Sequence, residues 1–143
     1  MTSFKTRREH YEADVRTVFD RIPIHRFFGI ELETVEPGRV TAVLDKRPEL
    51  SQQNGYFQAG ALVTLADAVG GSAAYSLTAG GENLLSINIS ISLMRPAAAD
   101  KIRGEGRVVK AGKNLYFCET VIFDAADPKR KPLMTAAITL TAV

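Results

Sequence analysis

One carboxylate stands out among the side chains that could do chemistry. Asp67 is the only charged residue between Glu49 and Glu82, and the two residues on either side of it are apolar. Burying an ionised carboxylate without partners is costly, so such a group either finds hydrogen bonds or has a raised pKa. In a cleft, it can act as a general base or a nucleophile. The pattern is equally compatible with a structural role, in which Asp67 caps another element or pairs with an arginine from a neighbouring strand.

Patterns of other catalytic classes are missing from the sequence. Residues 70–74, Gly-Gly-Ser-Ala-Ala, lack the last glycine of a G-x-S-x-G elbow, and residues 104–106 form only a bare G-x-G. His10 and His25 stand far from any Cys or acidic metal pattern, so we expect no metal and no cofactor, and both histidines at the surface. Cys118 is the single cysteine and lies in an apolar run, which predicts a buried structural thiol.

The composition indicates one domain with an ordinary core. The chain has 143 residues, 45% of them hydrophobic, and its 18 basic and 16 acidic residues leave a net charge of only +2. We expect a single domain over residues 1–143 and no nucleic-acid partner. The polar N-terminus lacks the apolar stretch of a signal peptide, and no apolar run reaches the roughly 18 residues of a transmembrane helix. A cytoplasmic protein without membrane insertion is therefore expected.

The residues around Asp67 predict a long buried helix from residue 58 to about residue 77. Their apolar side chains go nearly all round a helical wheel, which is typical of a helix that is covered on every side. Gly70 and Gly71 lie inside this helix, where they let a neighbouring backbone come close at some cost in helix propensity.

An amphipathic surface helix is predicted for the N-terminal extension, residues 1–23. Thr2 or Ser3 can cap this helix, and Pro23 marks its end. Charged residues make its other face polar, and its role is predicted to be structural. Its apolar residues recur at helical spacing: Phe4, Tyr11, Val15, Val18, Phe19 and Ile22.

Strands make up most of the remaining chain. In residues 85–93, apolar side chains alternate strictly with small polar ones, which predicts one apolar and one polar face. The small polar residues of this strand are Ser86, Asn88, Ser90 and Ser92. The other predicted strands are residues 30–35, 39–44, 101–110, 114–124 and 133–143. This order predicts an α+β fold, in which a curved antiparallel sheet wraps around the long helix and hides its apolar surface.

Three segments together resemble the PaaI-like hotdog thioesterases. Residues 52–67, Gln-Gln-Asn-Gly-Tyr-Phe-Gln-Ala-Gly-Ala-Leu-Val-Thr-Leu-Ala-Asp, are similar to the family signature N-x-x-G-x-x-H-G-G-x-x-x-x-L-x-D. Residues 86–97 look like the family's strand that ends in R-P-A, and residues 108–115 look like its V-x-x-G-K/R hairpin. The resemblance covers roughly residues 27–143 and implies a hotdog fold that hydrolyses acyl-CoA, with active sites at the interface of a homodimer or homotetramer.

By position, the resemblance assigns roles to individual residues. Asp67 matches the carboxylate that activates water or attacks the thioester carbonyl. Ala59, with Gly60, matches the helix N-terminus whose backbone N–H polarises that carbonyl, and Ser86 matches a residue that helps to place the water. The family's histidine is Gln58 here and its first following glycine is Ala59; glutamine can still donate a hydrogen bond, and alanine keeps the N–H.

The substrate-binding residues follow from the same resemblance and from the phosphates of coenzyme A. Gln52 stands where the family has asparagine, although Asn54 is close by, and the basic candidates are equally compatible with ordinary surface charge. The full set is Gln52, Asn54, Gly55, Gln58, Arg95, Lys110 and Lys113.

Helix geometry constrains how these groups could cooperate. Ala59 and Asp67 are eight positions apart, which is about 12 Å of rise along a helix. They cannot both touch one carbonyl carbon, so if both act, they come from different subunits, with two such helices antiparallel across a two-fold axis. The alternatives are a non-catalytic acyl-CoA or fatty-acyl binding protein, a hydratase of the same fold, for which no Asp–His pair is evident, and a purely structural oligomer.

Overall fold

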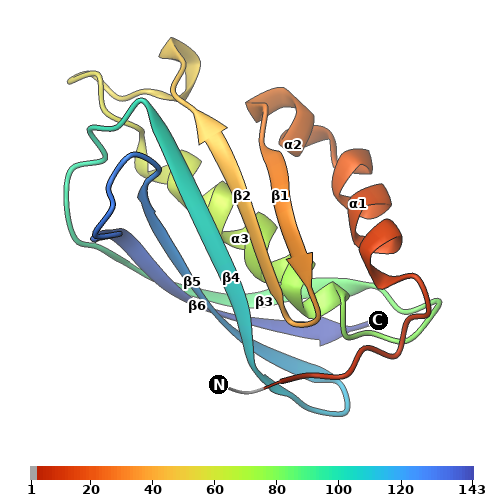
Figure 1. Ribbon diagram of the computed structural model, residues 1–143. Coiled ribbons are helices and arrows are strands. Elements are labelled where there is room, and N and C mark those ends of the chain that lie inside the picture. Colours follow the sequence, from red (N-terminus) through yellow and green to blue (C-terminus); the bar gives the residue numbers. More distant parts are fainter. Residues whose placement is uncertain (1–2) are drawn as a thin grey trace.

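The computed structural model describes residues 3–143 as a curved sheet that partly encloses one long helix (Figure 1). The helices are α1 (Tyr11–Arg21), α2 (Pro23–Phe28) and α3 (Ala59–Tyr75), with a 3-10 turn at Pro48–Leu50. The strands are β1 (Glu31–Glu36), β2 (Arg39–Asp45), β3 (Leu84–Leu93), β4 (Lys101–Ala111), β5 (Leu115–Asp124) and β6 (Pro132–Ala142). The six predicted strands are confirmed, each with its ends within about one residue of the predicted ones.

The sheet has the order β1-β2-β4-β5-β6-β3, and every pair of neighbours is antiparallel. The chain therefore runs from β2 through α3 to β3 at the far edge, and then returns to the middle of the sheet with β4. Helix α3 lies across the concave face and packs mainly against β2, β4 and β5. The predicted α+β hotdog architecture is confirmed.

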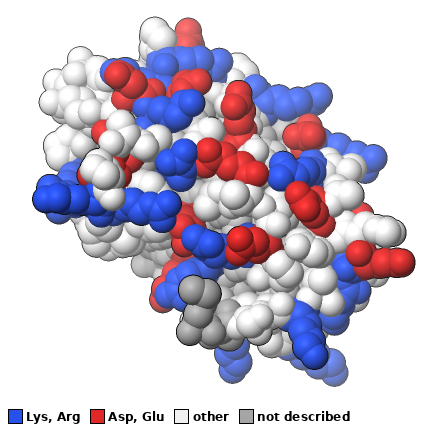
Figure 2. Space-filling view, in the orientation of Figure 1, with Lys and Arg blue, Asp and Glu red and all other residues white. Residues whose placement is uncertain are grey.

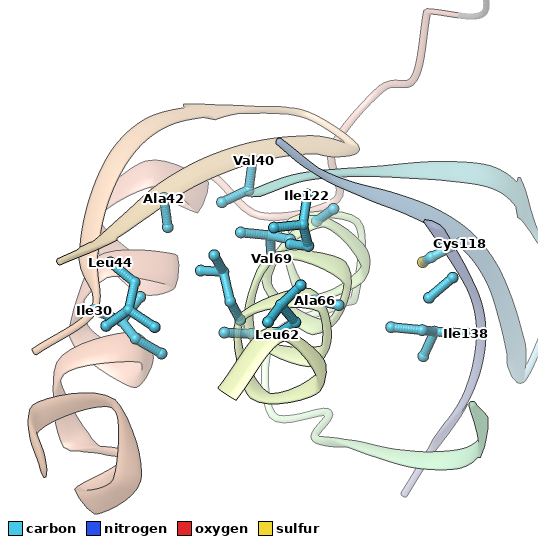
Figure 3. Packing of buried hydrophobic residues seen from close by; sticks show 14 of the residues in the cluster. Ile30, Val40, Ala42, Leu44, Leu62, Ala66, Val69, Cys118, Ile122 and Ile138 are labelled. Carbon is cyan, nitrogen blue, oxygen red and sulfur yellow. The ribbon is translucent and has the colours of Figure 1, made fainter. Parts of the chain in front are cut away.

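Helix α3 is buried as its apolar wheel predicts. Leu65, Ala66 and Val69 have no exposed surface. Figure 3 shows Ala66 and Val69 inside the curved sheet among the buried side chains. Full burial of a large apolar side chain between helix and sheet stabilises the folded state by roughly 1.5–3 kcal/mol. The helix therefore holds the two halves of the sheet together.

Glycines in β4 let the backbone of α3 touch the sheet. A Cβ atom on Gly106 would lie 2.4 Å from the backbone carbonyl carbon of Val69, and one on Gly104 would lie 3.0 Å from side-chain atoms of Leu65 and Ile122. The contact at Gly106 is backbone against backbone, so neither rotamer changes nor a flexible neighbour can make room. The G-x-G of residues 104–106 is thus a packing site for the helix.

A β-bulge at Ile87 divides β3 into two parts. Ser86 pairs with Leu140, and the register shifts by one residue at Ile87. Directly paired residues lie on the same face of a sheet, so Ser86 faces α3 like the buried Leu140, whereas Ser90, beyond the bulge, faces away. The prediction that all small polar residues of this strand lie on one face is therefore wrong. The extra residue in the bulge makes the side chains before it face the opposite way from what strict alternation predicts.

The start predicted for the N-terminal helix is also wrong, because α1 begins at Tyr11. Thr2 lies outside the described residues. Ser3 does not cap a helix, since the chain from there to His10 is not helical. Thr6 Oγ1 donates to the carbonyl of Ser76 at 2.6 Å, and such long-range bonds hold this segment along the end of α3 instead.

Pro23 marks the end of α1, as predicted, and it also begins the next helix. Helix α1 ends at Arg21, and Pro23 is the first residue of α2. Proline suits this position because the first N–H of a helix has no intrahelical acceptor. Within residues 3–143, no helix is long and apolar enough to cross a membrane.

We expect Gly106→Ala to lower the free energy of unfolding by about 1–3 kcal/mol, since the new methyl group would collide with the Val69 backbone. Urea unfolding measures the change. Gly80→Ala is the matched control, because a Cβ at Gly80 meets nothing within 4 Å, and we expect it to stay within about 0.5 kcal/mol of the parent protein. Equal stability of the two variants would contradict the close-contact argument.

Candidate active site

Asp67 and Ser86 form the central polar pair of the candidate site. Ser86 Oγ donates a hydrogen bond to Asp67 Oδ1 at 2.7 Å. Asp67 is half-buried in the middle of α3, and Ser86 lies near the start of β3 on the face turned toward the helix. The hydrogen-bond partner of this carboxylate is a hydroxyl group and not an arginine from a neighbouring strand.

The bulge at Ile87 makes this pair possible. Without the extra residue, Ser86 would share the outward orientation of Ser90 and Ser92, on the face away from α3. The sequence contains no sign of this reversal, because the apolar and polar residues alternate through the bulge without a break.

A cavity of about 370 Å³ adjoins Asp67 and Ser86. This volume is within the usual range of small-molecule sites, roughly 300–1,000 Å³. Helix α1 supplies Val15, Val18 and Phe19, and α3 and β3 supply most of the remaining wall. The cavity is therefore mainly apolar, with the Asp67–Ser86 pair as a polar group at its side.

A second, larger hollow of about 460 Å³ lies on the outer face of the sheet. It contains the ion pair of Arg107 and Glu119 and no residue of α3. Acidic and basic side chains alternate over the outer surface of β1, β2 and β4 (Figure 2), where Arg103 pairs with Glu33 at 2.6 Å. We place the site at the smaller cavity because a carboxylate, a hydroxyl and apolar walls meet there.

His25 is buried in the wall of the same cavity, so its predicted surface position is wrong, whereas His10 is exposed as expected. Its ring packs on Phe19 with centroids 4.2 Å apart, and Nδ1 lies 3.1 Å from the Phe19 carbonyl oxygen. A carbonyl can only accept, so Nδ1 carries the proton. Burial lowers the pKa of His25, against smaller opposing effects of the Phe19 carbonyl and the Asp67 charge. The neighbours of His25 along the chain gave no signal for this burial, since Ile24 is itself 47% exposed.

The N-terminus of α3 has one free backbone donor. Gln58 caps the helix, and its Oε1 accepts the Gly60 N–H at 2.5 Å. The N–H of Ala59 has no acceptor within residues 3–143. Of the two backbone donors assigned by resemblance, the one on Gly60 is thus already engaged, and the one on Ala59 is available.

The other binding candidates near this terminus form a tight turn. Gln52 Oε1 accepts the backbone N–H groups of Asn54 and Tyr56, and Gly55 has a φ of +81°, which favours glycine. Phe57 N–H donates to the Ala97 carbonyl at 3.1 Å, so the loop that follows β3 lies beside this turn. Gln52, Asn54, Gly55 and Gln58 therefore gather at one end of α3.

The basic candidates do not converge within one chain. Arg95 follows the end of β3 and donates to the Pro132 carbonyl at 2.9 Å. Lys110 and Lys113 are exposed on the β4–β5 hairpin. Leu115, at the start of β5, pairs with Thr141, which also pairs with Leu85 near the start of β3. The hairpin therefore lies at the end of the sheet opposite to Arg95. Arg95 is therefore close to the Gln58 end of α3, and the two lysines are remote from it.

Known proteins of one family are similar to this chain. Residues 54–130 match the family model of the thioesterase superfamily, which is more than half of the 143 residues. The chain is 27% identical over 96 residues to the proofreading thioesterase EntH of Klebsiella pneumoniae, a match that covers 67% of this chain and 70% of EntH.

Solved structures give the same result for the fold. A thioesterase family protein from Silicibacter pomeroyi superimposes with a TM-score of 0.89 and 28% identity, covering 93% of this chain and 98% of that one. A phenylacetic acid degradation-related protein from Ralstonia eutropha, 19% identical, gives a TM-score of 0.80 over 93% of this chain and 99% of its own. At that identity the likeness shows the shared fold alone.

Cys118 does not belong to the site, as predicted. It is buried, and burial raises the pKa of its thiol to about 12. We therefore expect no reaction of the native protein with a thiol-specific chromogenic reagent at pH 8, and one thiol per chain after unfolding in urea. Rapid labelling of the native protein would contradict this. The same experiment shows whether Cys118 would disturb an assay of released thiol.

Proposed function

The chain belongs to the thioesterase superfamily and is a thioester hydrolase, and from this we propose that its substrate is an acyl-CoA and that Asp67 is its catalytic carboxylate. The observation that carries the proposal is the 2.7 Å hydrogen bond between Ser86 and Asp67 beside an apolar cavity. The cavity offers room for an acyl group, and Asp67 and Ser86 form part of its wall. An acyl- or aryl-acyl-CoA fits this arrangement.

The hydrogen bonding of Asp67 favours a general base. Ser86 donates its only proton to Oδ1, and Oδ2 has no partner in the described part of the chain. A water molecule can donate one proton to Oδ2 and the other to the lone pairs of Ser86 Oγ. Such a water is held and activated by the two side chains together, so Ser86 is a positioning residue for it.

The reaction follows from these positions. The water oxygen attacks the thioester carbonyl carbon while Asp67 takes up a proton, and the carbonyl oxygen becomes an oxyanion. Collapse of this intermediate breaks the C–S bond. The proton on Asp67 passes to the leaving thiolate, which releases free CoA and a carboxylic acid and restores the Asp67 carboxylate.

The oxyanion needs donors that one chain does not supply near Asp67. The free N–H of Ala59, at the positive end of α3, is such a donor. It lies about 12 Å along the helix from Asp67, so we propose that it acts on the substrate bound at Asp67 of a partner subunit. Arg95, which lies at the same end as Ala59, would then reach the CoA bound to that partner.

The edge strand β3 supports a homodimer. Ile89, Ile91 and Leu93 lie on the core side of the sheet yet are 38%, 40% and 54% exposed, because no described residue covers them. An exposed apolar strand with unpaired backbone groups is a strong template for pairing with another chain. A two-fold axis across β3 would cover both edges and set the two α3 helices antiparallel.

We expect Asp67→Asn to lower kcat by at least about 10³-fold without loss of stability, since the amide cannot accept a proton. Free-thiol release from phenylacetyl-, benzoyl- and straight-chain acyl-CoAs measures the effect. Asp100→Asn, a change of the same kind at an exposed carboxylate, is the control and should retain full activity. Full activity of Asp67→Asn would refute the assignment of Asp67, and no release by the parent protein would refute the acyl-CoA assignment.

We expect Ala59→Pro to fold normally and to lose about 10²–10³-fold in kcat, because proline is well tolerated at the first helical position but has no N–H. The Gln58 backbone, at φ −72° and ψ 144°, already suits a following proline. Activity and melting temperature together measure this outcome. Full activity would show that the Ala59 N–H takes no part.

Subunit mixing tests whether Ala59 and Asp67 come from different chains. Co-refolding Ala59→Pro with Asp67→Asn at equal amounts should restore about a quarter of the parent activity, because half of the dimers are mixed and each has one intact site. Each variant refolded alone is the control. No recovery in the mixture would place both groups in one subunit and refute the dimer mechanism.

A further inference from the structure

The cavity beside Asp67 runs lengthwise along α3. The residues of α3 that line it include Thr64, Asp67, Gly71 and Tyr75, which are three or four positions apart and therefore share one face of the helix. Tyr75 is also the last residue of α3. Asp67 thus stands partway along the cavity, and Tyr75 lies near one end.

The two ends of the cavity differ. At the end away from Tyr75, Ile22 and Ile24 of the cavity wall are 36% and 47% exposed. At the other end, Tyr75 is half-buried beneath the N-terminal segment that crosses the end of α3. A substrate therefore enters from the Ile22–Ile24 side or past Asp67, and its acyl tail points toward Tyr75.

Arg8 holds the ring of Tyr75 in place. Its guanidinium lies 4.1 Å from the centre of the ring, and it donates to Thr78 Oγ1 at 3.0 and 2.9 Å and to the Glu82 carbonyl at 3.2 Å. It also forms an ion pair with Asp14 of α1 at 3.3 Å. Only 8% of Arg8 is exposed, so this cation–π contact is largely desolvated, which strengthens it.

The distance between Asp67 and Tyr75 limits the length of the tail. The two residues are eight positions apart, about 12 Å along the helix. An extended chain advances about 1.2 Å per bond, so about ten bonds span this distance, and the Tyr75 side chain takes up part of it. The room that remains suits an acyl group of about eight carbons.

We propose that Tyr75 forms the end wall of the acyl cavity and limits the substrate to medium-length acyl groups, with Arg8 as the positioning residue that fixes the ring. This rests on the proposed function in so far as the cavity is taken to receive the acyl group of an acyl-CoA. It makes the N-terminal segment, which contains no catalytic group, a determinant of substrate length.

The test measures chain length by binding and by hydrolysis separately. Calorimetry with saturated acyl-CoAs of 4 to about 16 carbons uses the Asp67→Asn protein, which is expected to bind without turnover. Up to the limit, each added methylene should raise affinity about fourfold, and beyond about eight carbons the gain should stop. The same series with the parent protein gives kcat/KM.

Substitution of Tyr75→Ala should move the limit up by roughly four carbons, since the removed ring spans about 5 Å of an extended chain. Tyr75→Phe keeps the ring and should leave the limit where it is. Arg8→Gln removes the stacked cation, so we expect affinity to level off more gradually with acyl length. A purely structural role of Arg8 would leave this dependence on length unchanged. A melting temperature for each variant shows that it is folded.

Two outcomes separate this inference from the proposed function. An unchanged limit in a folded Tyr75→Ala protein overturns the end wall, even when the parent hydrolyses acyl-CoA. A limit that shifts in the binding series while the parent releases no thiol supports the end wall and refutes the proposed hydrolysis of acyl-CoA.

Discussion

The backbone contact between α3 and β4 determines how deeply the long helix sits in the sheet. At Gly106 no Cβ fits, because it would lie only 2.4 Å from the carbonyl carbon of Val69. Asp67 is two residues before Val69, so its position above β3 depends on this contact. A hydrogen bond loses its strength when donor and acceptor separate by more than a few tenths of an ångström beyond 3.2 Å. A helix lifted from the sheet would therefore separate Asp67 from Ser86, which are 2.7 Å apart.

Sequence periodicity predicted the strands and the long helix that contains Asp67, but it did not predict which way the side chains of β3 face. The apolar wheel of residues 58–77 and the alternation in the strands are local properties, so the buried helix and the strand ends followed from them. The bulge at Ile87 has no compositional sign, and it decides that Ser86 faces Asp67. His25 and Arg8 were misjudged or overlooked for another reason. Arg8 is buried by partners far along the chain, such as Thr78, and the ring of His25 packs on Phe19 across the break between α1 and α2. A local pattern reveals neither contact.

The candidate residues fall into two groups at different levels of α3. Asp67 and Ser86 form one group in the middle of the helix, and the turn from Gln52 to Gln58 with the Ala59 N–H forms the other at its start. Gln58 stands where the related signature has histidine. An imidazole titrates near neutral pH, whereas a glutamine amide does not, so the electrostatic field at this helix end stays constant over that range.

The strand order has a consequence for folding during synthesis. β3 precedes β4 and β5 in the chain, yet its only neighbour in the sheet is β6, which is made after both of them. An apolar strand thus leaves the ribosome some forty residues before the strand that pairs with it. Such long-range pairing slows folding, because the loop between the two strands must close first. The Ile89–Leu93 stripe therefore has no strand partner in the nascent chain until β6 is made, which makes it a segment where chaperones or aggregation would act.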